Sequence, residues 1–125
     1  MNTLCRSVIV SLTILSGQSV LADDSVQAGE KAFRYKCVGC HEHTAYHRTV
    51  GPDLNGVFNR KAGSLPQGIY SRALMDSNIV WDDKTLDEFL SGPSDKIPMT
   101  FMPFHGVSDA QERMNIIAFL KTLGR

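Results

Sequence analysis

Apolar residues recur with a helical period at both ends of this chain of 125 residues. Near the start, Val26, Gly29 and Phe33 share one side of a helix, and charged residues occupy the other side. Near the end, the apolar residues of segment 108–123 repeat in the same way before Gly124, a typical helix stop. No segment shows the strict alternation of a β-strand. The pattern predicts an all-α fold.

Polar residues with capping-box spacing predict where the two terminal helices begin. Asp24 and Gln27 have this spacing at the start of the first helix. Ser108 and Gln111 have it at the start of the last helix. We therefore expect the first helix to begin near Asp24 and the last near Ser108.

The middle of the chain is predicted to hold two short helices between two long loops. Apolar residues at helical spacing predict the helices over 71–76 and 82–91. Segments 42–69 and 94–107 carry the Gly and Pro residues that mark turns. Loops this long in a small domain are usually functional, which suggests that they wrap around a bound group.

The first 22 residues have the features of a secretory signal. Arg6 is their only charge, and a short apolar core over 8–15 precedes the small residue Ala22. The apolar run is too short to cross the ~30 Å of hydrocarbon in a bilayer. We therefore expect a cleaved signal peptide over 1–22 and a single domain over 23–125, exported without a stable membrane anchor.

The segment Cys37-Val38-Gly39-Cys40-His41 reads C-x-x-C-H, the signature of covalent c-type haem attachment. The two thiols add across the vinyl groups of a haem, and the histidine that follows becomes the proximal ligand of the iron. We therefore expect one covalent haem c bound through Cys37 and Cys40, with His41 as a metal ligand. A buried haem also supplies apolar area that a domain of about 100 residues lacks.

Other uses of a cysteine pair are weighed against haem. A redox dithiol of the thioredoxin kind needs a βαβ pattern around the motif, and none is visible. A tetrahedral zinc site needs four ligands, which on paper His43 and His47 could complete. A disulfide is the ordinary expectation for two cysteines in an exported protein, but the adjacent His41 favours haem.

A haem held by one histidine has a second axial site, and four methionines are candidates for it. Met75 and Met114 lie on predicted helices, where methionine usually fills the core. Met99 and Met102 lie in the predicted loop 94–107, and residue chemistry alone does not choose between them. A methionine ligand makes an electron carrier, whereas an open site binds oxygen or peroxide.

The chain resembles the class I c-type cytochromes, the family that includes mitochondrial cytochrome c and bacterial cytochrome c2. The resemblance covers the whole of 23–125, and the matching segments are 28–33, 37–41, 51–63, 79–81, 86–90, 98–104 and 116–121. It implies the class I cytochrome c fold, in which the N- and C-terminal helices cross and shorter helices and long loops wrap around one covalent haem.

The resemblance also implies the axial ligands. In the P-x-x-x-M-x-F pattern of the family the methionine is axial, which matches Met102, four residues after Pro98; Met99 is the runner-up. Pro52 lies in the loop whose carbonyl accepts the other imidazole N–H of His41, a contact that fixes the tautomer.

Further cofactor-binding residues follow from the same resemblance. Tyr70 and Trp81 match positions that hydrogen-bond a haem propionate, and Arg60 matches a cation near one. Each could instead be ordinary packing or a surface charge. Gly29 and Phe33 match the place where the first helix crosses the last.

Three departures from the family pattern bear on function. Phe89 stands where many relatives have a tyrosine that reaches the axial sulfur, and Leu74 where many have asparagine. Ser94, Asp95 and Phe101 replace lysines that form a docking ring in mitochondrial relatives. Since Lys plus Arg (13) equals Asp plus Glu (13), we expect weak steering toward acidic partners and no affinity for nucleic acid.

The resemblance implies a soluble one-electron carrier, a monomer in the periplasm, and not an enzyme. Its expected partners are transient redox proteins, such as a cytochrome reductase, an oxidase or a periplasmic dehydrogenase. Two alternatives stay open: a cytochrome subunit docked permanently on a dehydrogenase, and a haem protein with a labile sixth ligand that acts as a peroxidase or sensor.

Overall fold

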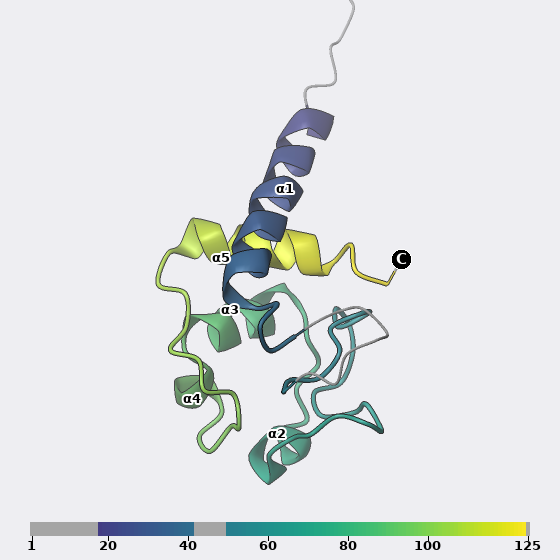
Figure 1. Ribbon diagram of the computed structural model, residues 1–125, viewed down its shortest axis with the longest axis vertical. Coiled ribbons are helices and arrows are strands. Elements are labelled where there is room, and N and C mark those ends of the chain that lie inside the picture. Colours follow the sequence, from purple (N-terminus) through teal and green to yellow (C-terminus); the bar gives the residue numbers. More distant parts are fainter. Residues whose placement is uncertain (1–17, 42–49, 125) are drawn as a thin grey trace, which may run out of the picture.

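Residues 18–41 and 50–124 are described in the computed structural model of the chain (Figure 1). The helices are α1 (Gln18–Lys36), α2 (Arg72–Asp76), α3 (Asp83–Ser91), α4 (Pro93–Lys96) and α5 (Ala110–Leu120). The described residues contain no strand, only an isolated bridge between Lys61 and Val80, which confirms the all-α prediction. None of the described helices combines the length and apolarity that a membrane span requires. Cleavage after residue 22 stays a prediction.

Helices α1 and α5 cross at the centre of the fold, as the resemblance implied (Figure 1). Gly29 of α1 is buried at the crossing, where an added Cβ would lie 1.9 Å from the carbonyl oxygen of Asn115. One turn later, the fully buried ring of Phe33 packs against the ring of Phe119, with 5.1 Å between the ring centroids. Glycine is required here because any side chain would push the two helices apart.

The first helix begins earlier than expected, so the capping box predicted from Asp24 to Gln27 is wrong. Helix α1 starts at Gln18 and its N-terminal part stands clear of the other elements (Figure 1). Gln27 Nε2 donates to Asp23 Oδ2 at 2.9 Å, a contact between residues one turn apart on a helix surface. Residues 18–23 are also helical, so Asp24 lies inside α1 and does not cap its N-terminus.

The last helix is capped by Asp109 and not by Ser108. Asp109 Oδ1 accepts a hydrogen bond from Glu112 N at 2.6 Å, and α5 begins at the next residue. The carbonyl of Ser108 instead accepts a hydrogen bond from the Arg113 side chain at 3.0 Å. Two overlapping cap signals stand side by side in the sequence, and because Asp and Ser cap helices about equally well, the local context selects Asp109.

The predicted loop 94–107 begins with a helical turn, α4, which the sequence reasoning missed. Pro93 occupies the first position of α4 and is buried. Proline suits that position because its φ is already helical and no N–H is needed there. The rest of the segment is loop, anchored by the buried residues Ile97 and Val107.

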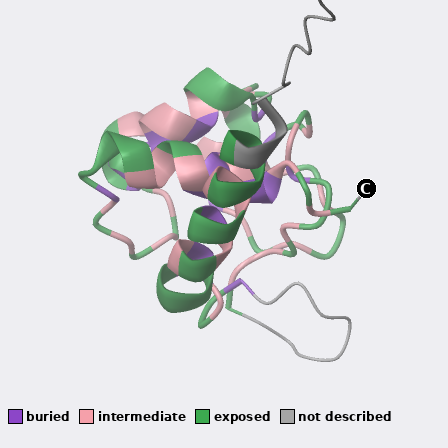
Figure 2. Ribbon diagram, turned by 90° about the horizontal axis from the view of Figure 1, so that it is seen from above, coloured by how far each residue is buried: buried purple, intermediate pink, exposed green. Residues whose placement is uncertain are grey.

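Helix α3 follows its prediction closely. Asp82 Oδ1 accepts from Thr85 N, and Thr85 Oγ1 accepts from Asp82 N, both at 2.8 Å, in a reciprocal capping box. The hydrogen bonds that Thr85 N and Thr85 Oγ1 donate to the Asp82 carboxyl, at 2.8 and 2.9 Å, hold its pKa below its usual value. The predicted stripe of Leu86, Phe89 and Leu90 is buried, and Figure 2 shows buried residues gathered where the helices face one another.

The side chain of Arg113 connects α5 to α3 and to the loop between them. Its Nε donates to Asp87 Oδ1 at 2.7 Å, and its Nη1 donates to the carbonyl of Val107 at 2.9 Å as well as to that of Ser108. The side chain is only 12% exposed. Its loss would leave a carboxylate and two carbonyls without these donors.

We expect Arg113→Ala to lower the free energy of unfolding of the holoprotein by about 2–3 kcal/mol, because partly buried charged hydrogen bonds are lost. Urea denaturation followed by circular dichroism measures the change. Lys84→Ala is the matched control, since Lys84 Nζ lies 4.0 Å from Glu88 Oε1 and its side chain is 83% exposed. The control is expected to change stability by less than ~0.5 kcal/mol. Equal effects of the two substitutions would contradict the structural role of Arg113.

Candidate cofactor site

A cavity of about 510 Å³ lies inside the fold, in the size range of small-molecule and cofactor sites. Its walls come from α1, α3, α5, the start of α2 and both long loops. All seven residues predicted to bind the cofactor or its metal line it: Cys37, Cys40, His41, Arg60, Tyr70, Trp81 and Met102. The fold therefore brings together residues that are far apart in the sequence.

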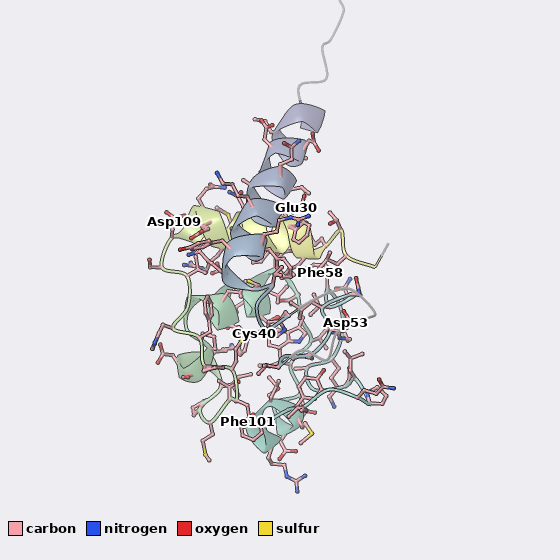
Figure 3. The ribbon with its side chains drawn as sticks, viewed as in Figure 1. Glu30, Cys40, Asp53, Phe58, Phe101 and Asp109 are labelled. Carbon is pink, nitrogen blue, oxygen red and sulfur yellow. The ribbon has the colours of Figure 1, made fainter. Side chains whose placement is uncertain are left out.

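The two cysteines lie on a helical turn that continues from the end of α1. The N–H of Cys37 donates to the carbonyl of Phe33 at 2.8 Å, and the N–H of His41 donates to the carbonyl of Cys37 at 2.7 Å. Cys37 is buried, Cys40 is exposed (labelled in Figure 3), and both thiols are free. Burial raises the pKa of the Cys37 thiol to about 11, so this thiol stays protonated at neutral pH.

The imidazole of His41 is buried and held by a backbone carbonyl. Its Nδ1 donates to the carbonyl oxygen of Pro52 at 2.9 Å, the contact that the resemblance implied. This bond places the proton on Nδ1 and leaves the lone pair of Nε2 for a metal. Burial also lowers the pKa of His41, which favours the neutral form that binds metals.

Gly51 positions this histidine, a role that the sequence reasoning did not assign. A Cβ on Gly51 would lie 2.4 Å from Cε1 and 2.6 Å from Nδ1 of His41, too close for any side chain. The N–H of Gly51 donates to the carbonyl of Cys40 at 2.8 Å, which ties this end of the loop to the cysteine turn. The sequence analysis assigned the carbonyl contact to the loop at Pro52 but gave Gly51 no role of its own, although a glycine before the carbonyl partner of a ligand could have suggested close packing.

Of the four methionines considered, Met102 is the one that lines the described cavity. Met99 lies three residues earlier in the same loop and is 84% exposed. The expectation that Met75 and Met114 fill the core is wrong, because both are exposed on α2 and α5. Other residues of these helices, such as Leu74 on α2, face the cavity instead.

The three predicted propionate neighbours lie in different surroundings. Arg60 donates from Nη1 to the carbonyl of Asn55 at 2.7 Å and from Nη2 to that of Asp53 at 2.8 Å, so it also shapes the loop. Burial raises the pKa of the Tyr70 phenol, and the positive charge of Arg60 opposes the rise. Trp81 is buried, with its ring 5.0 Å from that of Phe89.

The donor set and the charge of the cavity fit haem c. One wall offers two thiols and a metal-binding imidazole nitrogen, and the loop 97–107 offers a thioether. The charged residues among the described lining are Lys36, Arg60 and Lys61, with no carboxylate, which suits a group that carries two negative propionates.

His43 and His47, which a zinc site would need, lie outside the described residues. The two departures at Leu74 and Phe89 both line the cavity and make its wall more apolar.

Comparison with known proteins gives a consistent result. Residues 26–124 match the family model described as cytochrome c. The chain is 42% identical over 98 residues to cytochrome c of Sesamum indicum, covering 77% of this chain and 87% of that protein. It is 43% identical over 94 residues to cytochrome c2 of Rhodoblastus acidophilus, covering 74% and 87% of the two chains. Among solved structures, cytochrome cH from Methylobacterium extorquens superimposes with a TM-score of 0.72 at 42% identity, covering 78% of this chain and 97% of that one.

Proposed function

Because the chain belongs to the cytochrome c family, we propose that its haem iron is held between His41 and Met102. The chain carries one covalent haem c, attached through Cys37 and Cys40, and acts as an electron carrier. The bound haem supplies a one-electron couple, while the protein binds, orients and shields it.

The observation that carries the assignment of ligands is the convergence of two distant segments on one cavity. His41 lines it from the turn after α1, and Met102 lines it from the loop 97–107. The hydrogen bond from His41 Nδ1 to Pro52 supports a fixed, neutral imidazole whose Nε2 binds metal. Met102 contributes a thioether, a soft donor that raises the reduction potential.

Arg60, Tyr70 and Trp81 are assigned to the haem propionates. Their positions in the lining of the cavity support this role, as does the excess of cations over carboxylates there. Hydrogen bonds and positive charge offset the unfavourable burial of a propionate. The Arg60 side chain also hydrogen-bonds the carbonyls of Asn55 and Asp53, so we infer that the same residue binds a propionate and stabilises the loop before it.

The carrier is further proposed to be a soluble monomer of the periplasm, released when residues 1–22 are removed, that meets its donor and acceptor transiently. Outer-sphere electron transfer needs no catalytic acid or base, so no enzymatic activity is assigned. The buried cavity walls support this role because they limit the solvent rearrangement that accompanies a change of charge.

The optical spectrum of the holoprotein tests the axial ligands. We expect the weak near-infrared band from methionine sulfur to ferric iron in the wild type and in Met99→Ala, and its loss in Met102→Ala. Met99→Ala is the matched control, because it removes a methionine from the same loop that does not line the cavity. A band lost in Met99→Ala and kept in Met102→Ala would contradict the assignment.

The apolar wall around Met102 favours one alternative enough to test it. Phe89 and Leu74 line the cavity and offer no hydroxyl or amide to the sulfur. If the wild type lacks the near-infrared band and its reduced form binds carbon monoxide readily, the sixth site is open. The protein is then a peroxidase or a sensor and not a His–Met carrier. A stable complex with a dehydrogenase on gel filtration would instead indicate a permanent subunit.

A further inference from the structure

A group of exposed apolar side chains surrounds the mouth of the cavity. The group, called here the rim patch, consists of Val50, Ile69, Met99 and Phe101, which are 74%, 72%, 84% and 67% exposed. Val50, Ile69 and Phe101 also line the cavity, so part of their exposed surface faces the haem and the rest forms the outer edge of the cavity; Met99 is two residues from Phe101 and does not line it. Figure 3 shows Phe101 beside α2, at the end of the molecule away from α1.

Met99 has a backbone conformation that is unfavourable for a residue with a Cβ, within a turn closed by the hydrogen bond from Thr100 N to the carbonyl of Ile97 at 3.1 Å. Its φ is 66°, in the left-handed region that costs a residue with a Cβ about 1–2 kcal/mol. The other non-glycine residues with positive φ are Asn59 and Asn78 in the described part of the chain, and asparagine tolerates this region. The turn accounts for the backbone conformation, whereas the exposed Met99 side chain gains little packing within the monomer.

The segment that carries Met99 and Phe101 contains no charged residue, and the two charged residues of the neighbouring helix α2, Arg72 and Asp76, lie 3.9 Å apart as an ion pair. Residues 97–107 contain no Asp, Glu, Lys or Arg, and His105 is their only titratable side chain. Lys96, just before this segment, forms an ion pair with Glu88. The segment therefore offers a partner apolar contact and no ion pair.

We propose that the rim patch is the docking surface for a redox partner that presents an uncharged, apolar face. The proposal rests on the proposed electron-transfer function, because the mouth of the haem cavity is where an electron enters or leaves. Four side chains expose only a few hundred Å², whereas each partner in a stable complex buries roughly 800 Å². The patch therefore suits a transient encounter and not a permanent dimer.

Apolar recognition has a kinetic signature. Docking through complementary charges slows steeply as salt is added, whereas apolar contact does not depend on the Debye length. Apolar interface residues near the centre of a contact also contribute most of the affinity, so removing them has a large effect. Electron exchange should therefore be sensitive to the rim patch and insensitive to salt.

The dependence of electron exchange on the rim patch is tested by voltammetry of the holoprotein. The gold electrodes are coated with methyl-terminated or carboxylate-terminated alkanethiols. We expect faster electron exchange at the methyl surface, changing less than about twofold between ~10 and ~500 mM salt. The double variant Met99→Ser, Phe101→Ser is expected to lose about tenfold in rate there. Met114→Ser, which changes an exposed methionine on α5, is the matched control and should leave the rate unchanged.

Three results would overturn the proposal: faster exchange at the carboxylate surface, an unchanged rate in the double variant, or an equal loss in Met114→Ser. Two further measurements separate other occupants of the patch. Sedimentation of a wild-type dimer, or binding to phosphatidylcholine vesicles, that disappears in the double variant would assign the patch to a second copy or to a membrane.

The near-infrared band separates this inference from the proposed function. A slower rate with the band intact concerns docking alone, whereas loss of the band in the wild type contradicts the His–Met assignment. Ile69→Ser serves as a second variant because it lies outside the Met102 loop, on the loop before α2. If the double variant disturbs ligation, a slower rate in Ile69→Ser supports the proposal and an unchanged rate contradicts it.

Discussion

The chain without its haem is expected to be unfolded under conditions where the holoprotein is stable. Without haem the apolar walls of a cavity of about 510 Å³ must face water or collapse, and each buried Val, Leu, Ile, Phe or Met side chain that becomes exposed costs about 1.5–3 kcal/mol. The whole stability of a typical domain is only about 5–15 kcal/mol. The cavity is lined by core residues of three helices, such as Phe33, Leu86 and Ile116, so its collapse cannot stay local.

Circular dichroism of a Cys37→Ala, Cys40→Ala variant purified without haem measures this effect. We expect little helical signal, no near-ultraviolet signal from packed aromatic rings, and no cooperative thermal transition. The holoprotein in the same buffer is the control, and it should show all three. A haem-free chain with native near-ultraviolet dichroism would contradict the view that the cofactor completes the core.

Gly29→Ala is expected to destabilise the holoprotein by at least about 2–3 kcal/mol, the size of a severe overpacking. Two effects oppose each other. Alanine in the middle of a helix is favoured over glycine by roughly 0.5–1 kcal/mol. Its Cβ would, however, lie 1.9 Å and 2.5 Å from the carbonyl oxygen and carbon of Asn115, which are backbone atoms that cannot rotate away. The clash outweighs the propensity because the two helices must separate and loosen the contact between Phe33 and Phe119.

Guanidinium denaturation of the holoprotein measures the change in unfolding free energy. Gly39→Ala is the matched control, because a Cβ there would meet nothing within 4 Å. We expect the control to stay within ~0.5 kcal/mol of the wild type. A higher unfolding free energy for Gly29→Ala would contradict this prediction. It would mean that α1 and α5 can shift apart without losing stability, so that the higher helix propensity of alanine outweighs the clash.

Local patterns in the sequence were enough to predict the haem motif and most of the helices. The C-x-x-C-H motif and the stripe of Leu86, Phe89 and Leu90 are set by spacing within one or two helical turns, and both appear as expected. The choice of Met102 over Met99 came from the P-x-x-x-M-x-F pattern of the family. The structure adds that Met102 lines the cavity and Met99 does not.

Helix boundaries show where local signals compete. Asp24 was a plausible cap, yet α1 continues through it, and Asp109 capped α5 although Ser108 had the same spacing. The free-energy differences between neighbouring caps are about 1 kcal/mol or less, so small effects of context decide between them. The same limit explains why the short helix α4 after Gly92 was not expected.

Contacts between distant segments were decided only by the tertiary structure. The sequence by itself determined the all-α class, the covalent haem and the order of its motifs, because these depend on residue chemistry and short spacings. It did not determine that Gly51 must lie against His41, or that Met75 and Met114 face solvent. The physical reason is that a side chain is buried or exposed by what packs against it, and helical period alone does not say which face meets a neighbour.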